Sequence, residues 1–208
     1  MAEDADSWTE LKSDIADWLN RDDLSTQIPK FIAQAEREFN RVLRVPEMEA
    51  VAELAIDAAT VALPADLLEM RALTLDTDPK IVLEPMTLAE LRNSYAAAAT
   101  GKPQNFAIQS GSTLVLGPAP DSAYAGRLNY FQKIAPLDAA TASNWLLAAH
   151  SDVYLAGALW RAHVYLVDDA NAARWKAIMG EGLEQIMTAG RRRAYGAAPL
   201  RIRSAQPI

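Results

Sequence analysis

The segment of residues 151–167 constrains the fold of this chain more than any other. Its sequence, SDVYLAGALWRAHVYLV, has the length of an ordinary helix and is apolar nearly all round. A helix that is apolar on every face is stable only when other elements cover it. Asp152, Arg161 and His163 are too many polar groups for an unassisted membrane span, so we expect no membrane contact. We predict a buried helix at the centre of a bundle.

Helical patterns at both ends of the chain supply the rest of this bundle. Ser7 and Glu10 have the spacing of a capping box at the start of a first helix. Pro29 suits the first turn of a second helix that begins at about Ile28. A long amphipathic helix is predicted over residues 169–195, and we expect the two N-terminal helices to cover its apolar seam. This seam consists of Trp175, Met179, Gly182, Ile186 and Ala189.

Between Pro46 and Pro136 the pattern changes to short apolar stretches separated by Pro, Gly, Asp and Ser. The sequence FAIQSGSTLVL predicts a β-hairpin with Ser110-Gly111 at its tight turn. One helix is expected at about Thr87–Ala98, with Thr87 as its cap. This part of the chain is therefore expected to form a β-rich domain.

The predicted fold class is α+β, mainly α, with a helical bundle from both termini and an inserted small antiparallel β-rich domain. We expect residues 1–45 and 137–196 to form the bundle. Residues 46–136 are expected to form the β-rich insert with its one helix, and residues 197–208 an extended C-terminal arm.

The charge of the chain is unevenly distributed. Residues 191–208 contain five arginines and no acidic residue, a net charge of +5. The rest of the chain carries 15 basic and 27 acidic residues, a net charge of −12. An acidic body repels a nucleic-acid backbone, so we expect no sequence-specific binding of DNA.

The tripeptide His150-Ser151-Asp152 is the most suggestive polar cluster in the sequence. Adjacent residues on a helix do not face one another, so these three cannot form a hydrogen-bonded relay. Asp152 and His163 share a helix face but lie roughly 16 Å apart along its axis. We interpret Ser151 or Asp152 as the cap of the central helix, His150 as the end of the preceding turn, and His163 as a core or interface histidine.

No other pattern indicates a reactive or metal site. The chain has no cysteine, which excludes disulfides, thiolate metal sites and cysteine nucleophiles. Asp76 and Asp78 lack the further acid of a calcium loop, and the region of Gly111–Gly117 lacks the glycine spacing and lysine of a phosphate loop. Helical carboxylates such as Glu36 and Glu38 are interpreted as solvated. We therefore expect no catalytic residue, no metal, no cofactor and no enzymatic activity.

Several longer blocks stand in one order along the chain. They are QIPKFIAQAEREFNR, LPADLLEMRALTLD, GKPQNFAIQSGSTLVLGPAPDSAY, and NWLLAAHSDVYLAGAL followed by DDANAARW. Together, over about residues 8–203, they resemble the head-to-tail adaptor proteins of short-tailed and related tailed bacteriophages, the tail tubular or gatekeeper-ring class. Ser151 stands where the family pattern has a proline, and Gly117 where it has an aromatic residue.

The resemblance implies a virion structural protein at the head–tail junction, made in the host cytoplasm. It implies a homo-oligomeric ring, a dodecamer, that binds the portal protein on one side and a tail nozzle or tail tube protein on the other. DNA would pass through its lumen without sequence-specific binding, which suits an acidic body. Two other classes remain open, a cell-wall hydrolase-type tail accessory enzyme and a cellular helical interaction module.

The basic C-terminal arm is the candidate portal-binding site. In an extended strand Leu200 and Ile202 would lie on one face, and Arg201 and Arg203 on the other. Such a strand can add to the edge of a partner's sheet or lie in a groove, with its guanidinium groups on portal carboxylates. The candidate residues are Arg191, Arg192, Arg193, Leu200, Arg201, Ile202 and Arg203.

Overall fold

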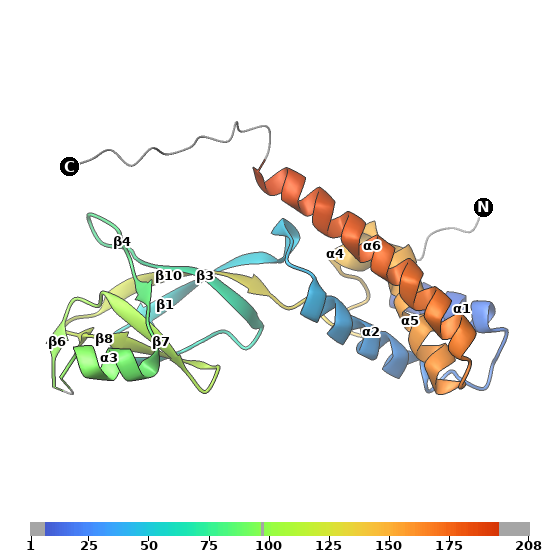
Figure 1. Cartoon of the computed structure of the whole chain (residues 1–208), viewed down its shortest axis with the longest axis horizontal. Helices are drawn as coiled ribbons and strands as arrows, with labels where there is room; N and C mark the ends of the chain where they lie inside the picture. Colours follow the sequence, from blue (N-terminus) through green and yellow to red (C-terminus); the bar gives the residue numbers. More distant parts are fainter. Residues whose placement is uncertain (1–6, 97, 196–208) are drawn as a thin grey trace. The chain divides into compact units, whose positions relative to one another are not determined.

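The computed structural model describes residues 7–96 and 98–195 (Figure 1). It confirms the predicted fold class, because the protein is α+β and mainly helical, with mostly antiparallel sheets. The chain divides into two compact units, Met1–Glu47 with Ile134–Ile208, and Met48–Lys133. We call them the helical unit and the β unit.

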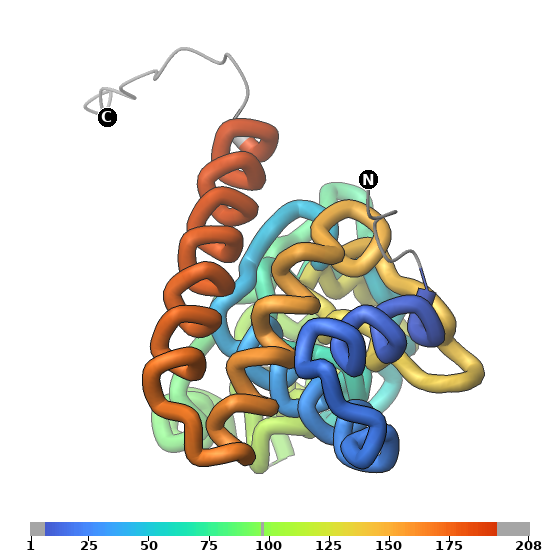
Figure 2. Tube along the Cα trace, turned by 90° about the vertical axis from the view of Figure 1, so that its right-hand side faces the viewer, coloured from blue at the N-terminus to red at the C-terminus, as the bar shows by residue number. Residues whose placement is uncertain are grey.

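The helical unit is organised around one buried helix. Its α-helices are α1 (Trp8–Leu19), α2 (Ile28–Val42), α4 (Trp145–Ala149), α5 (Ser151–Tyr165) and α6 (Asp169–Tyr195). As predicted, α5 is the central helix and packs against α1, α2, α4 and α6 (Figure 2). Val153, Tyr154, Ala158 and Leu159 are all at most 2% exposed, and they cover different faces of α5. This burial accounts for the almost continuous apolar sequence.

The starts of several helices follow from their local sequence. The Ser7 hydroxyl oxygen accepts a hydrogen bond from the Glu10 N–H (3.3 Å) at the start of α1. Helix α2 begins at Ile28 with a proline in its first turn. In the β unit, Thr87 and Glu90 form a complete capping box before α3 (Leu88–Ser94). The predicted caps of α1 and α3 are thus confirmed.

The packing of α6 differs from the prediction. Its main partner is α5, since Gly182 of α6 faces Val153 and a Cβ at position 182 would lie 2.6 Å from Val153 Cγ2. Trp175 is only half-buried and meets the exposed ring of Trp18 edge-on, with 5.3 Å between the ring centroids. The buried line runs through Ala172, Met179, Leu183, Ile186 and Gly190.

The geometry of a straight helix explains the shift. Positions spaced alternately by four and three residues drift by about 20° per heptad relative to a helix with 3.6 residues per turn. Towards the C-terminal end of α6, the predicted seam therefore no longer faces α5. Ala189 is exposed, and its neighbour Gly190 is buried in its place.

The β unit contains two four-stranded sheets and one small two-stranded sheet. The strand orders are β1-β10-β3-β4, β2-β8-β7-β5 and β6-β9. Pairing is antiparallel except between β5 and β7 and between β6 and β9, which are parallel. The strands are β1 (Glu49–Ile56), β2 (Thr60–Ala62), β3 (Leu67–Leu75), β4 (Ile81–Val82), β5 (Glu84–Pro85), β6 (Thr100–Gly101), β7 (Asn105–Gln109), β8 (Thr113–Gly117), β9 (Ala119–Pro120) and β10 (Tyr124–Gln132).

Both four-stranded sheets contribute to one apolar core. Leu73, Leu128 and Ile56 come from the first sheet, and Leu114 and Phe106 from the second. The predicted hairpin is confirmed as β7–β8, in which Phe106 pairs with Leu116. Its turn has positive φ angles of 53° at Ser110 and 71° at Gly111, the backbone that this turn requires.

Replacing either of two glycines of the helical unit by alanine should change the free energy of unfolding, in opposite directions. A Cβ at Gly157 of α5 would lie 2.9 Å from Phe39 Cζ and 3.0 Å from the Ala35 Cβ, whereas a Cβ at Gly180 of α6 would meet no atom within 4 Å. We expect Gly157→Ala to lower the free energy of unfolding by about 1–3 kcal/mol, because α2 must move away. Gly180→Ala should raise it by about 0.5–1 kcal/mol, since alanine favours the helix.

Urea unfolding of the two variants measures both effects. Equal stabilisation by the two substitutions would contradict the close approach of α2 and α5.

Candidate functional site

The end of α6 carries the described part of the predicted arm. Arg191, Arg192 and Arg193 lie in its last turns with exposed side chains. Cations at this end of a helix interact favourably with the macrodipole. The other predicted arm residues, Leu200, Arg201, Ile202 and Arg203, lie outside the described residues.

Contacts within the helical unit hold the end of α6 in place. A Cβ at Gly190 would lie 2.9 Å from Val45 Cγ1 and 3.2 Å from Pro46 Cδ, so the helix and this segment approach closely. The guanidinium group of Arg193 forms an ion pair with Glu47 Oε1. Because the Arg193 side chain is 58% exposed, this pair contributes less than about 1 kcal/mol. The pair joins the end of α6 to the segment that follows α2.

His150 joins α4 to α5 through its backbone. Its N–H donates to Leu146 O (2.8 Å), and its carbonyl accepts from the Val153 N–H (3.2 Å). The prediction that Ser151 or Asp152 caps α5 is wrong, because both are already helical and His150 occupies the N-cap position without a side-chain hydrogen bond. Among the described residues, no hydrogen bond joins these three side chains, and the tripeptide forms no relay.

His163 contacts the start of α6. Its Nδ1 atom lies 3.2 Å from Asp168 Oδ2, within ion-pair distance but without hydrogen-bond geometry. Asp168 accepts hydrogen bonds from the side chain (2.6 Å) and the backbone N–H (3.2 Å) of Asn171. These bonds, with a smaller effect of His163, lower the pKa of Asp168. His163 thus contacts Asp168 where the chain turns from α5 into α6.

A buried polar network connects α2, α4 and α5. Glu36 is 6% exposed, and its Oε1 accepts hydrogen bonds from the Leu137 N–H (2.8 Å) and the Tyr154 hydroxyl (3.3 Å). The Asn144 side-chain amide donates to the Tyr154 hydroxyl and to Ala135 O, both at 2.7 Å. Burial raises the pKa of Glu36, and burial with the adjacent carboxylate raises the pKa of Tyr154.

The interpretation of Glu36 as a solvated residue is therefore wrong. Glu36 lies four residues after Ile32 and one after Ala35, on the apolar face of α2, and this position was the signal that could have revealed it. Tyr154 is completely shielded from solvent, and Glu36 is nearly so. The bonds of the network satisfy buried polar groups and fix the packing of the helices.

Residues 7–96 and 98–195 contain no group of three or more His, Asp or Glu side chains arranged to hold a metal ion. Over the same ranges, no helix has both the length and the apolar composition needed to cross a membrane.

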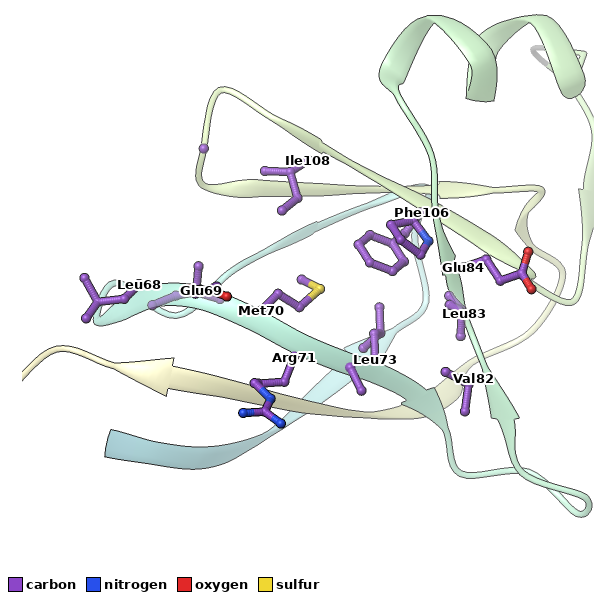
Figure 3. Close-up of a pocket in the computed structure, with 14 residues that line it drawn as sticks. Leu68, Glu69, Met70, Arg71, Leu73, Val82, Leu83, Glu84, Phe106 and Ile108 are labelled. Carbon is purple, nitrogen blue, oxygen red and sulfur yellow. The ribbon is translucent and has the colours of Figure 1, made fainter. Parts of the chain in front are cut away.

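The β unit contains a pocket of about 650 Å³ (Figure 3). Leu67, Met70 and Leu73 of β3 line one side, and Phe106 and Ile108 of β7 line another. The segment that contains β4 and β5 closes one end (Figure 3). The lining is mainly apolar and has the character of a binding groove.

The comparison with known families decides the class of the protein. The family model described as SU10 adaptor protein matches residues 6–203, which is nearly the whole chain. The chain belongs to the SU10 adaptor protein family. This confirms the resemblance to bacteriophage head-to-tail adaptors. No curated protein matches the chain.

Membership of the SU10 adaptor family gives the sites above a structural context. It is a family of phage structural proteins and is not known for enzymatic activity. The histidines of this adaptor-family chain lie at helix junctions, and its buried carboxylate lies in a core network. The end of α6 and the apolar pocket are therefore its candidate interaction sites.

The raised pKa of Glu36 predicts a pH-dependent stability. A group with a raised folded-state pKa binds its proton more strongly in the folded chain, so its contribution is present at low pH and is lost as the pH rises through that pKa. Lowering the pH from about 7 to about 4, the range down to the ordinary pKa of a glutamate, should stabilise the wild type relative to Glu36→Gln. Urea unfolding at several pH values measures the difference.

Glu184→Gln is the matched control, since Glu184 is an exposed helical residue of the same unit. Its difference from wild type should not follow this trend. If the wild-type and Glu36→Gln curves stay parallel over this range, the carboxyl group of Glu36 is not desolvated.

Proposed function

We propose that this chain is a head-to-tail adaptor that forms a ring, a dodecamer, between the portal and the tail nozzle or tail tube. The observation that carries the proposal is the family match over residues 6–203. DNA passes through the lumen of this ring, and the acidic body of the chain limits its adhesion to the DNA backbone. The protein is made in the host cytoplasm and acts in the virion at the head–tail junction.

Exposed apolar side chains on the helical unit support self-assembly. Trp18 is 62% exposed at the end of α1, and Tyr165 and Val167 are 55% and 83% exposed at the end of α5. Large exposed apolar side chains that lie together are typical of protein–protein contacts. Helices α1 and α5 also pack against each other. This end of the helical unit is suited to a contact between subunits.

The basic arm supplies the contact with the portal. Arg191 and Arg192 are exposed at an end of α6 that Gly190 and Arg193 hold in place. Residues Leu200, Arg201, Ile202 and Arg203 follow with alternating apolar and basic side chains. An arm of this pattern, starting from a fixed point, can pair with a sheet edge of the portal and place guanidinium groups on its carboxylates.

Deletion of residues 197–208 tests the portal contact. The truncated chain should keep the circular dichroism spectrum and melting temperature of the wild type, because the deleted residues follow the last described helix, α6. It should no longer co-sediment with portal-containing heads. Deletion of residues 205–208 alone is the control, since it keeps the alternating segment, and it should leave docking intact.

Electron microscopy of the wild-type protein mixed with portal-containing heads tests the ring itself. Full docking of the chain that lacks residues 197–208 would show that the helical unit, and not the arm, binds the portal. Absence of a ring on the heads would overturn the proposed function.

A further inference from the structure

The pocket of the β unit is bordered by two strands whose outer edges are only partly used. Strand β4 pairs with β3 at Thr74 and Leu75, and the Leu83 N–H extends this pairing to Leu73 O (2.8 Å). Among the described residues, no strand lies on the outer side of β3 over positions 67–72. A strand edge of this kind presents backbone groups to which a further strand can bond.

The second border of the pocket is β7. Strand β5 pairs with β7 at Asn105 and Phe106, and the Met86 N–H donates to Phe106 O (2.8 Å). Within the described residues, β5 does not extend beside positions 107–109. Figure 3 shows the resulting arrangement, with the β7–β8 hairpin on one side of the pocket and β3 on the other. The two incomplete edges therefore border one apolar groove.

Irregular pairing of β3 aims its apolar side chains at the core side of this groove. The register between β3 and β10 shifts twice, so that Leu68 and Arg71 have no paired residue opposite them. Leu67 and Met70, which adjoin these positions, pack against the core together with the fully buried Leu73. Bulges of this kind change the direction of side chains. Here they place apolar side chains at the bottom of the groove, beside the uncovered edge of β3.

The ionisable residues of the lining are Glu69, Arg71 and Glu84, so its net charge is negative. Arg71 also forms an ion pair with Glu49 (3.2 Å), and its guanidinium group lies 5.1 Å from the ring centroid of Phe131. An extended segment with apolar side chains on one face and cationic groups on the other complements such a groove.

We propose that this groove receives residues 199–203 of a second copy of the chain as an added β-strand. Leu200 and Ile202 lie against the apolar floor, and Arg201 and Arg203 face the carboxylates at the border. Residue 199 is the fourth and residue 203 the eighth after the last described position, Tyr195, so an extended chain carries them up to roughly 13 Å and 26 Å from it. The segment can therefore reach a neighbouring subunit.

The contact rests on the proposed function for one point, that the ring places copies of the chain side by side. In a ring that is not bound to a portal, this contact holds residues 199–203 of each subunit in the groove of a neighbour. The portal then competes with the groove for the same residues. A strand that is stored in a groove is protected from pairing with other exposed edges.

Engineered cysteines test this contact in the full chain, because the natural sequence contains none. One chain carries Ile108→Cys, at a pocket-lining side chain that is 44% exposed, and another carries Ile202→Cys. A disulfide requires Cβ atoms only about 3.5–4.5 Å apart, so it reports close contact. After the two chains are mixed without portal and mildly oxidised, we expect the disulfide-linked heterodimer as the main product.

Two matched variants control for position. Val51→Cys lies on β1, the edge strand opposite β4 in the sheet that contains β3, and Val51 is 62% exposed. Arg201→Cys places the thiol on the other face of the arm. Mixtures of Val51→Cys with Ile202→Cys, and of Ile108→Cys with Arg201→Cys, should give little heterodimer. Portal-containing heads should reduce the yield of the main product.

The outcomes separate the inference from the proposed function. If rings form in electron micrographs but the Ile108→Cys and Ile202→Cys chains do not cross-link, the inference is overturned and the ring stands. A heterodimer yield that is equal for Val51→Cys also overturns it, because the arm then binds exposed edges indiscriminately. A chain that carries both Ile108→Cys and Ile202→Cys tests the remaining alternative. If this chain forms the disulfide internally while the mixed single variants do not cross-link, the arm does not pass to a second copy.

Discussion

The burial of α5 is the constraint on which the helical unit depends. This helix has apolar residues on all its faces, so α1, α2, α4 and α6 must all cover it. One close approach is with α2, where Gly157 leaves room for Phe39 and Ala35. Beside it, the rings of Phe39 and Tyr154 meet nearly at right angles with centroids 5.1 Å apart. The Tyr154 hydroxyl then reaches Glu36, so apolar packing and the polar network share one contact.

Much of the fold could be predicted from local sequence signals. The caps at Ser7 and Thr87 and the turn at Ser110 and Gly111 act over a few residues, and the structure places all of them as expected. Features that depend on distant residues were not predictable. The burial of Glu36 depends on Leu137, which lies about a hundred positions away, and the main partner of α6 depends on how several helices share the surface of α5.

The candidate sites show the same division. The basic cluster at the end of α6 is visible in the sequence because charge is counted directly. The ion pair of Arg193 with Glu47 joins residues that lie far apart in the sequence, and no spacing rule links them. The groove of the β unit depends on the register shifts of β3, which depend on its pairing with β10. Sequence patterns predict strands, but they do not predict which part of an edge stays uncovered.

The chain re-enters the helical unit at Ile134, beside the end of α2. This arrangement affects how proteins with this fold can diversify. The Ile134 N–H donates to Asn40 Oδ1 (2.9 Å) near the end of α2, and the Leu137 N–H donates to Glu36 one turn earlier. The re-entering chain is thus bonded to α2 a few residues before the point, after Glu47, where the chain leaves the helical unit. A segment inserted between two such points can change in length or sequence while the host keeps its packing. Evolution can therefore exchange the β unit as a module while the bundle of helices around α5 persists.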